Sequence, residues 1–192
     1  KVRAMHGFGI LAQFTENVSY SNMEVAPAPH SGRTCASPAD ILHFSGCKGL
    51  IRIDKCHLTA AHDDAMNVHG THLRIVGQPS PDQLRLRFIH HQSWGFQAFM
   101  PGDQIELIRM DTLLRYASNR IKSVEMTDDP REQIITLHQS IADGIQLNSD
   151  AVENITWTPS VHVSNTVVEQ IPTRGFLFTT RQPILVEKTK FL

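Results

Sequence analysis

The sequence predicts an all-β protein, and three observations support this class. Apolar residues are concentrated in short runs bounded by Gly, Pro, Asn and Ser, which is the pattern of strands joined by turns. Some runs alternate apolar and charged side chains, as residues 84–89 (Leu-Arg-Leu-Arg-Phe-Ile) do, and such alternation is typical of a half-buried strand. Few segments have the spacing of apolar residues that an amphipathic helix needs.

Strands are expected along the whole chain. Residues 78–82 (Gln-Pro-Ser-Pro-Asp) are turn residues and separate two of the expected strands. No internal repeat or low-complexity tract stands out. In chain order, the expected strands are residues 49–53, 73–76, 84–89, 105–110, 120–126, 160–164 and 183–186.

One segment is open to two interpretations. Residues 129–141 begin with Asp129, which can cap a helix, and Pro130, which suits its first turn. Residues 134–137 (Ile-Ile-Thr-Leu) equally suit a strand. The sequence leaves both alternatives open.

Composition limits the class of protein and of partner. A chain of 192 residues can form one domain or two small ones, and 41% hydrophobic with 19% charged residues is ordinary for a globular protein. The net charge of −1 predicts no general attraction to nucleic acid or to an anionic membrane. No apolar run approaches the ~18 residues of a spanning helix. Neither a nucleic acid nor a membrane is therefore expected as a partner.

The cysteines and sequons bear on the compartment. Cys35, Cys47 and Cys56 allow at most one internal disulfide, and the sequence does not say which pair forms it. Asn17 and Asn154 begin N-x-[ST] triplets, which permit glycosylation if the chain is secreted. Residues 1–12 resemble a signal peptide only faintly, so we expect the chain to start after any such signal.

A histidine and an aspartate have the features of a catalytic pair. His62 directly follows the small apolar residues 58–61 (Leu-Thr-Ala-Ala), and Asp103 precedes the expected strand at 105–110. In a Ser-His-Asp site the carboxylate holds the histidine Nδ1–H, which leaves Nε2 free to accept a proton. We therefore predict that His62 is a general base and that Asp103 orients it. No Gly-x-Ser-x-Gly motif occurs, and Thr180 is a poor replacement, so the nucleophile and the oxyanion donors stay unassigned.

Residues 43–51 (His-Phe-Ser-Gly-Cys-Lys-Gly-Leu-Ile), followed by residues 58–62, resemble the first-barrel signature of the trypsin/chymotrypsin-like serine proteases. Residues 88–94, 103–110 and 119–126 are similar, in family order, to further segments of that family. Residues 24–25 and 29–31 resemble its granule-protease branch. The resemblance covers residues 21–126 well and residues 127–192 poorly.

The resemblance implies a chymotrypsin-like antiparallel double β-barrel whose second barrel is incomplete or diverged. Its expected parts are an N-terminal extension at 1–20, a first barrel at 21–115 containing His62 and Asp103, and a partial second barrel at 116–192. It also implies a secreted or granule protein with a peptide or protein ligand, ancestral peptide-bond hydrolysis, no cofactor and no metal site. Because the family's free N-terminal Ile-Val-Gly-Gly and its serine motif are missing, the implied protease homologue is expected to be inactive.

Two alternatives stay open. The first is a non-catalytic binding module on a protease scaffold, with Arg85 and Arg87 on one strand face for a polyanion. The second is a metal-binding protein in which His62, His69 and His72, with Asp63 and Asp64 nearby, supply nitrogen and oxygen ligands.

Overall fold

A computed structural model describes residues 1–141 and 144–192, and its regular secondary structure over these residues is entirely β. The chain divides into two compact units. The coil unit consists of Lys1–Gly70 and Trp157–Leu192, and the barrel unit consists of Thr71–Thr156. The barrel unit is therefore an insertion within the sequence of the coil unit.

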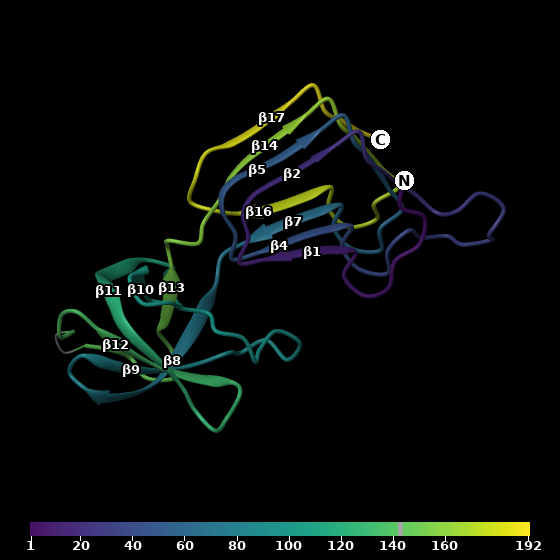
Figure 1. Ribbon diagram of the computed structural model, residues 1–192. Coiled ribbons are helices and arrows are strands. Elements are labelled where there is room, and N and C mark those ends of the chain that lie inside the picture. The colour runs from purple at the N-terminus through teal and green to yellow at the C-terminus, as the bar shows by residue number, and fades with distance from the viewer. Residues whose placement is uncertain (142–143) are drawn as a thin grey trace. The chain divides into compact units, whose positions relative to one another are not determined.

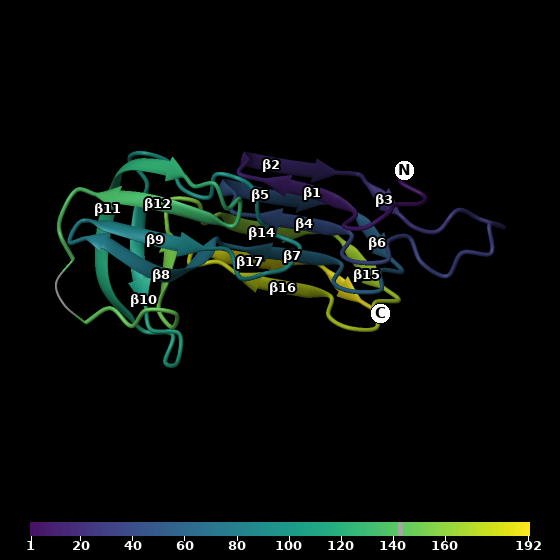
Figure 2. The same ribbon diagram turned by 90° about the horizontal axis from the view of Figure 1, so that it is seen from below.

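The coil unit contains three parallel sheets of four strands each (Figures 1 and 2). The first sheet has β1 (Ile10–Gln13), β4 (Leu42–Ser45), β7 (Met66–His69) and β16 (Phe176–Thr179). The second has β2 (Glu16–Ser21), β5 (Lys48–Asp54), β14 (Ser160–Ser164) and β17 (Ile184–Glu187). The third has β3 (Glu24–Val25), β6 (His57–Thr59), β15 (Val167–Glu169) and β18 (Lys190–Phe191). Each turn of the chain adds one strand to each sheet, so the unit is a parallel β-helix with four coils.

Columns of apolar side chains stabilise this stack. In the second sheet Val18 pairs with Ile51, Ile51 with Val161, and Val161 with Ile184. Ile51 is fully buried and Val161 almost so. Parallel strands in register place paired residues directly beside one another, and where these residues are apolar each coil covers those of the coil before it.

In the first sheet, the second, third and fourth coils repeat at a regular interval that the insertion hides, whereas Ile10 of the first coil lies 32 residues before its partner Leu42. Leu42 of β4 pairs with Met66 of β7, which is 24 residues further on. Met66 pairs in turn with Phe176, and removing the 86 residues of the barrel unit from that 110-residue separation again leaves 24. Periods of this length are typical of solenoids. The repeat does not stand out in the sequence because an inserted unit interrupts the third coil between β7 and β14.

The barrel unit is a closed antiparallel barrel (Figure 1). Around the barrel the order is β10 (Gln104–Ile108), β11 (Arg115–Met126), β12 (Glu132–Leu137), β9 (Gln83–Arg87), β8 (His72–Ser80) and β13 (Ala151–Asn154), which pairs again with β10. The alternation predicted for residues 84–87 is confirmed, because Leu84 and Leu86 are buried while Arg85 and Arg87 are exposed. Residues 132–137 form a strand, so the helix interpretation of 129–141 is wrong.

The all-β class is confirmed, but the coil unit is not part of an antiparallel double barrel. Its strand pairs are parallel, and the barrel unit is the closed antiparallel element in the described part of the chain. The two units also differ from the expected division at residues 20 and 115. The physical reason is that a short apolar run indicates a buried strand without indicating whether its neighbours run parallel or antiparallel.

Two further features concern the cysteines and membranes. Cys35, Cys47 and Cys56 are all free thiols, so the single disulfide that the sequence allowed is not formed. Over the described residues, no helix has the length and apolarity needed to cross a membrane.

Candidate active site

Two aspartates and one arginine occupy equivalent positions in successive coils, and a third aspartate lies beside them. Asp40 lies two residues before Leu42, and Asp64 lies two residues before its partner Met66. Arg174 lies two residues before Phe176, the next residue of the same register. The parallel ladder continues into these positions, because Ile41 N–H donates to Asp64 O at 3.0 Å and Ala65 N–H donates to Arg174 O at 3.4 Å. Asp40, Asp64 and Arg174 therefore form one column across successive coils, and Asp63 adjoins it.

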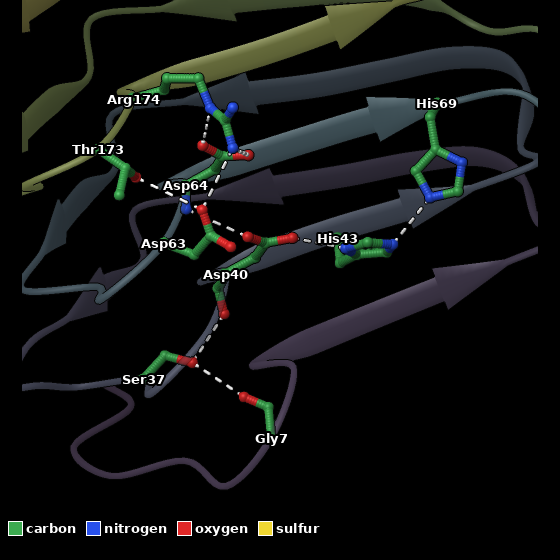
Figure 3. Close-up of polar contacts among 9 residues, drawn as sticks. All are labelled: Gly7, Ser37, Asp40, His43, Asp63, Asp64, His69, Thr173 and Arg174. Carbon is green, nitrogen blue, oxygen red and sulfur yellow. Dashed lines mark hydrogen bonds and ion pairs between the residues drawn. The ribbon is translucent and has the colours of Figure 1, made fainter. Parts of the chain in front are cut away.

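The carboxylates of Asp40, Asp63 and Asp64 are gathered at one place (Figure 3). One carboxylate oxygen from each lies within 4.8 Å of those of the other two. Asp40 is 2% exposed and Asp64 is fully buried, whereas the side chain of Asp63 is 50% exposed. Two carboxylates are thus held in the protein and a third faces solvent beside them.

Arg174 neutralises part of this charge. Its Nε donates to Asp64 Oδ1 at 2.7 Å, and its Nη2 donates to Asp64 Oδ2 and to Asp63 Oδ1, each at 3.3 Å. Charge-assisted bonds from a planar guanidinium to two acceptor oxygens orient a carboxylate as well as stabilise it. Burial raises the pKa of Asp64 above its ordinary value, the bonds and charge of Arg174 oppose that rise, and the charges of Asp40 and Asp63 add to it.

Asp40 is held by a different set of donors. His43 Nδ1 lies 2.6 Å from Asp40 Oδ2, and the backbone N–H of Asp64 donates to Asp40 Oδ1 at 3.1 Å. Burial alone would raise the pKa of Asp40, but these hydrogen bonds outweigh it and hold the pKa below its ordinary value. Asp40 and Asp64 therefore have pKa values displaced in opposite directions.

The segment before β1 fixes the loop that contains Asp40. Gly9 N–H donates to Asp40 O at 2.9 Å. The hydroxyl of Ser37 donates to Asp40 O at 2.7 Å, and its Oγ also lies 3.3 Å from Gly7 O (Figure 3). A Cβ at Gly9 would lie 2.8 Å from Asp40 O, a separation that real side chains do not adopt. The glycine is needed at this position for the close approach of the two backbones.

His62 and Asp103 lie in different units. His62 is exposed in the coil unit, and its backbone N–H donates to Ser37 O at 3.0 Å. Asp103 is buried in the barrel unit, where Oδ2 accepts the N–H of Met100 at 2.8 Å and Nδ2 of Asn154 at 2.7 Å. The pairing of His62 with Asp103 stays a prediction. Asn154, the first residue of the second sequon, is fully buried.

The histidine-based metal site is wrong. His69 directs Nδ1 to Gly70 O at 2.8 Å and Nε2 to His43 Nε2 at 2.9 Å. His72 belongs to the barrel unit, where its Nε2 lies 3.5 Å from Glu153 Oε1. Among the described residues, the side chains that gather closely enough for a cation are the three aspartates, and no histidine is among them.

The carboxylate oxygens of these three aspartates are ligands of the kind that hard cations such as Ca²⁺ and Mg²⁺ bind. Arg174 already binds Asp63 and Asp64 and supplies positive charge at this position. The negative charge of the cluster is therefore partly compensated by the protein itself.

Sequence reasoning considered Asp63 and Asp64 only as metal ligands and missed Asp40 and Arg174. A signal was present. Residues 40–44 (Asp-Ile-Leu-His-Phe) and 64–68 (Asp-Ala-Met-Asn-Val) share the pattern acidic, apolar, apolar, polar, apolar at the 24-residue interval of the coils.

Comparisons with known proteins agree on one family. Residues 83–152 match the family described as GLAA-B beta-barrel domain II. The chain is 52% identical over 187 residues to Alpha-1,3-galactosidase A of Akkermansia muciniphila, an alignment that covers 97% of this chain and 31% of that protein. It is 42% identical over 187 residues to Alpha-1,3-galactosidase A of Bacteroides fragilis, with 97% and 31% covered. It is 37% identical over 199 residues to Alpha-1,3-galactosidase B of Phocaeicola vulgatus, with 100% and 34% covered. The chain thus spans about a third of the length of these relatives.

These findings overturn the protease interpretation. The resemblance to trypsin-like serine proteases is wrong, and so are the inactive endopeptidase homologue and the binding module on a protease scaffold. The resemblance had a physical origin. Residues 58–61 are buried at the end of β6 and just after it, and the exposed His62 follows them, so a buried strand end before an exposed histidine gives the local pattern that resembled the protease signature. The barrel residues match the GLAA-B β-barrel domain II, and the whole chain is similar to α-1,3-galactosidases.

Proposed function

We propose that this chain carries the catalytic carboxylates of a glycoside hydrolase that releases galactose from α-1,3 linkages. The observation that carries the proposal is the cluster of Asp40, Asp63 and Asp64, with one carboxylate oxygen of each within 4.8 Å of the others. The similarity to proteins named α-1,3-galactosidase supports the substrate class.

Glycoside hydrolysis needs a pair of carboxyl groups with different protonation states. One group protonates the leaving oxygen, and the other acts as a carboxylate on the sugar or on water. Sites of this kind set their pKa values apart through burial and neighbouring charges. The pKa values of Asp40 and Asp64 are displaced in opposite directions, so neighbouring carboxyl groups of this cluster have different environments.

The contacts support a role for each aspartate. Asp40 has a lowered pKa and is bonded at both carboxylate oxygens, so we assign it as the carboxylate base. Both oxygens of Asp64 are bonded to Arg174, which keeps Asp64 ionised despite the effect of burial, so Asp64 anchors the guanidinium. The side chain of Asp63 is half exposed, so a substrate can approach its carboxyl group, and we assign it as the acid.

The test is hydrolysis of α-1,3-linked galactose disaccharides by the protein at its full natural length, with α-1,4- and β-1,3-linked isomers for comparison. We expect release of galactose from the α-1,3 isomer. Asp40→Asn and Asp63→Asn should each reduce kcat by about 100-fold or more, the range found for a lost acid or base.

A matched control is Glu16→Gln, which removes one exposed carboxylate from β2 in the same unit. Its activity should equal that of the unaltered protein. Full activity in Asp40→Asn and Asp63→Asn would reject the cluster as the catalytic site. Hydrolysis of the other isomers alone would reject the substrate class.

A further inference from the structure

A continuous chain of hydrogen bonds runs from Asp40 through two histidines to the backbone. Asp40 Oδ2 lies 2.6 Å from His43 Nδ1, and His43 Nε2 lies 2.9 Å from His69 Nε2 (Figure 3). His69 Nδ1 lies 2.8 Å from Gly70 O. The side chain of His43 is 12% exposed and that of Asp40 is 3% exposed, so the first bond of this chain is largely shielded from water.

The chain requires a definite number of protons. Gly70 O can only accept, so His69 Nδ1 must carry a hydrogen. The contact between the two Nε2 atoms needs one further hydrogen, and so does the contact between His43 and Asp40. An ionised carboxylate and two neutral imidazoles carry two hydrogens between them, whereas the three contacts need three.

We propose that the Asp40–His43–His69 chain retains this additional proton, with His43 as an imidazolium, and that both histidines are positioning residues for Asp40. Both histidines are bonded at both ring nitrogens, but only His43 lies next to the carboxylate of Asp40, which stabilises a cation. The proton count depends on the contacts alone. Its consequence for catalysis rests on the proposed function.

The charges around His43 support this assignment. The buried carboxylates of Asp40 and Asp64 bring two negative charges, and Arg174 brings one positive charge. Buried carboxylates are costly unless cations compensate them, and a protonated His43 supplies a second cation.

The other groups that face His43 do not oppose a positive charge. The ring centroid of Phe8, which precedes β1, lies 4.7 Å from that of His43, within the range in which an aromatic ring attracts a cation. Asn67 of the neighbouring strand β7 is the register partner of His43 and is uncharged. His69 donates its Nδ1 hydrogen to Gly70 and so presents a lone pair to His43.

A cation beside Asp40 has a direct consequence for its role. It favours the ionised form of Asp40 and fixes Oδ2, while the backbone of Asp64 fixes Oδ1. Asp40 therefore stays a carboxylate, the form a base requires, into mildly acidic solution. Without the accepting lone pair of His69, the second proton of His43 loses its partner and Asp40 loses its neighbouring cation.

The experiment measures proton occupancy directly. The protein at its full natural length is labelled with ¹⁵N-histidine, and nitrogen–proton correlations of the rings are recorded at pH 7, with His43→Gln used to assign the signals. We expect protons on both ring nitrogens of His43 and on Nδ1 of His69. A single protonated nitrogen on His43 would overturn the proposal.

Variants separate the proposal from a general effect on folding. His69→Leu removes the acceptor and should leave His43 with one protonated nitrogen, whereas His69→Gln offers a side-chain oxygen and should restore two. The matched control is His57→Gln, because His57 makes a similar 2.8 Å contact with Glu169 in the same unit. It should leave the signals of His43 unchanged.

A second measurement links the histidines to catalysis. In His69→Leu the loss of kcat/KM should be about tenfold larger at pH 5 than at pH 7, because Asp40 is protonated more readily without the cation. An equal loss at both pH values would assign His69 a structural role only. If the protein has no galactosidase activity, the proposed function fails, while the ring signals still decide the protonation of His43.

Discussion

Arg174 and Asp64 form a two-oxygen ion pair although 110 residues separate them in sequence. The pair forms because β16 is the register partner of β7, so the two residues are neighbours in successive coils. The barrel unit occupies 86 of the intervening residues and does not disturb this register. A β-helix tolerates such an insertion because each coil contacts only its neighbours.

The first prediction separates the acid from the base. If Asp63 protonates the leaving oxygen, Asp63→Asn should lose most of its activity on a disaccharide but much less on a galactoside with an acidic phenol as leaving group, which needs no protonation. Asp40→Asn should lose activity on both substrates. Steady-state kcat/KM values for the two substrates provide the measurement, and equal losses for Asp63→Asn would exclude it as the acid.

The second prediction concerns the arginine. Arg174→Met should destabilise the protein by about 1–3 kcal/mol, because it leaves the buried carboxylate of Asp64 without its charged donor. The double variant Arg174→Met with Asp64→Leu should recover part of that loss, since both partners are then removed. Urea unfolding of the protein and its variants measures both effects, and a stable single variant would contradict the importance of the pair.

The third prediction concerns stability in acid. The pKa of Asp40 in the folded protein is lowered, so its ionisation contributes stability that is fully present above the unfolded value of ~3.9. That contribution is lost as pH falls through the folded value. In Asp40→Asn the free energy of unfolding should therefore fall less steeply below about pH 4 than in the unaltered protein. Asp111→Asn, at an exposed position of the barrel unit, should leave the slope unchanged.

The fourth prediction tests the apolar columns of the coils. Ile51 is fully buried between Val18 and Val161, so Ile51→Ala should cost about 2–5 kcal/mol through lost contacts and a cavity. Its neighbour Arg52 is exposed on the same strand, and Arg52→Ala should change stability by less than about 0.5 kcal/mol. Chemical unfolding monitored by circular dichroism compares the two variants.

The fifth prediction tests the loop that contains Asp40. Gly9→Ala forces the new Cβ against Ile41 O and Asp40 O and should displace that loop, which lowers both stability and kcat. Gly7→Ala meets no atom within 4 Å, so its cost should be confined to the left-handed backbone at φ 60°, about 1–2 kcal/mol. An alanine at Gly9 that leaves kcat at the level of the Gly7 variant would show that this contact does not position Asp40.

Local patterns in the sequence determined the all-β class and several individual strands. Leu84 and Leu86 are buried as their alternation with arginines predicts, because a strand directs successive side chains to opposite faces. The same reasoning failed for β4, β5 and β6, whose short apolar runs resembled a protease barrel. A buried strand in a parallel coil needs the same small and apolar residues as a buried strand in a barrel.

Tertiary structure alone decided which distant residues form the site. The sequence contains Asp40, Asp64 and Arg174, but their common column exists only when the coils stack in register, although the barrel unit separates two of them in the sequence. The proton count of the Asp40–His43–His69 chain likewise depends on which ring nitrogens meet. Periodicity along a chain specifies which residues are buried, whereas charge pairing and proton sharing depend on separations that only the packed coils provide.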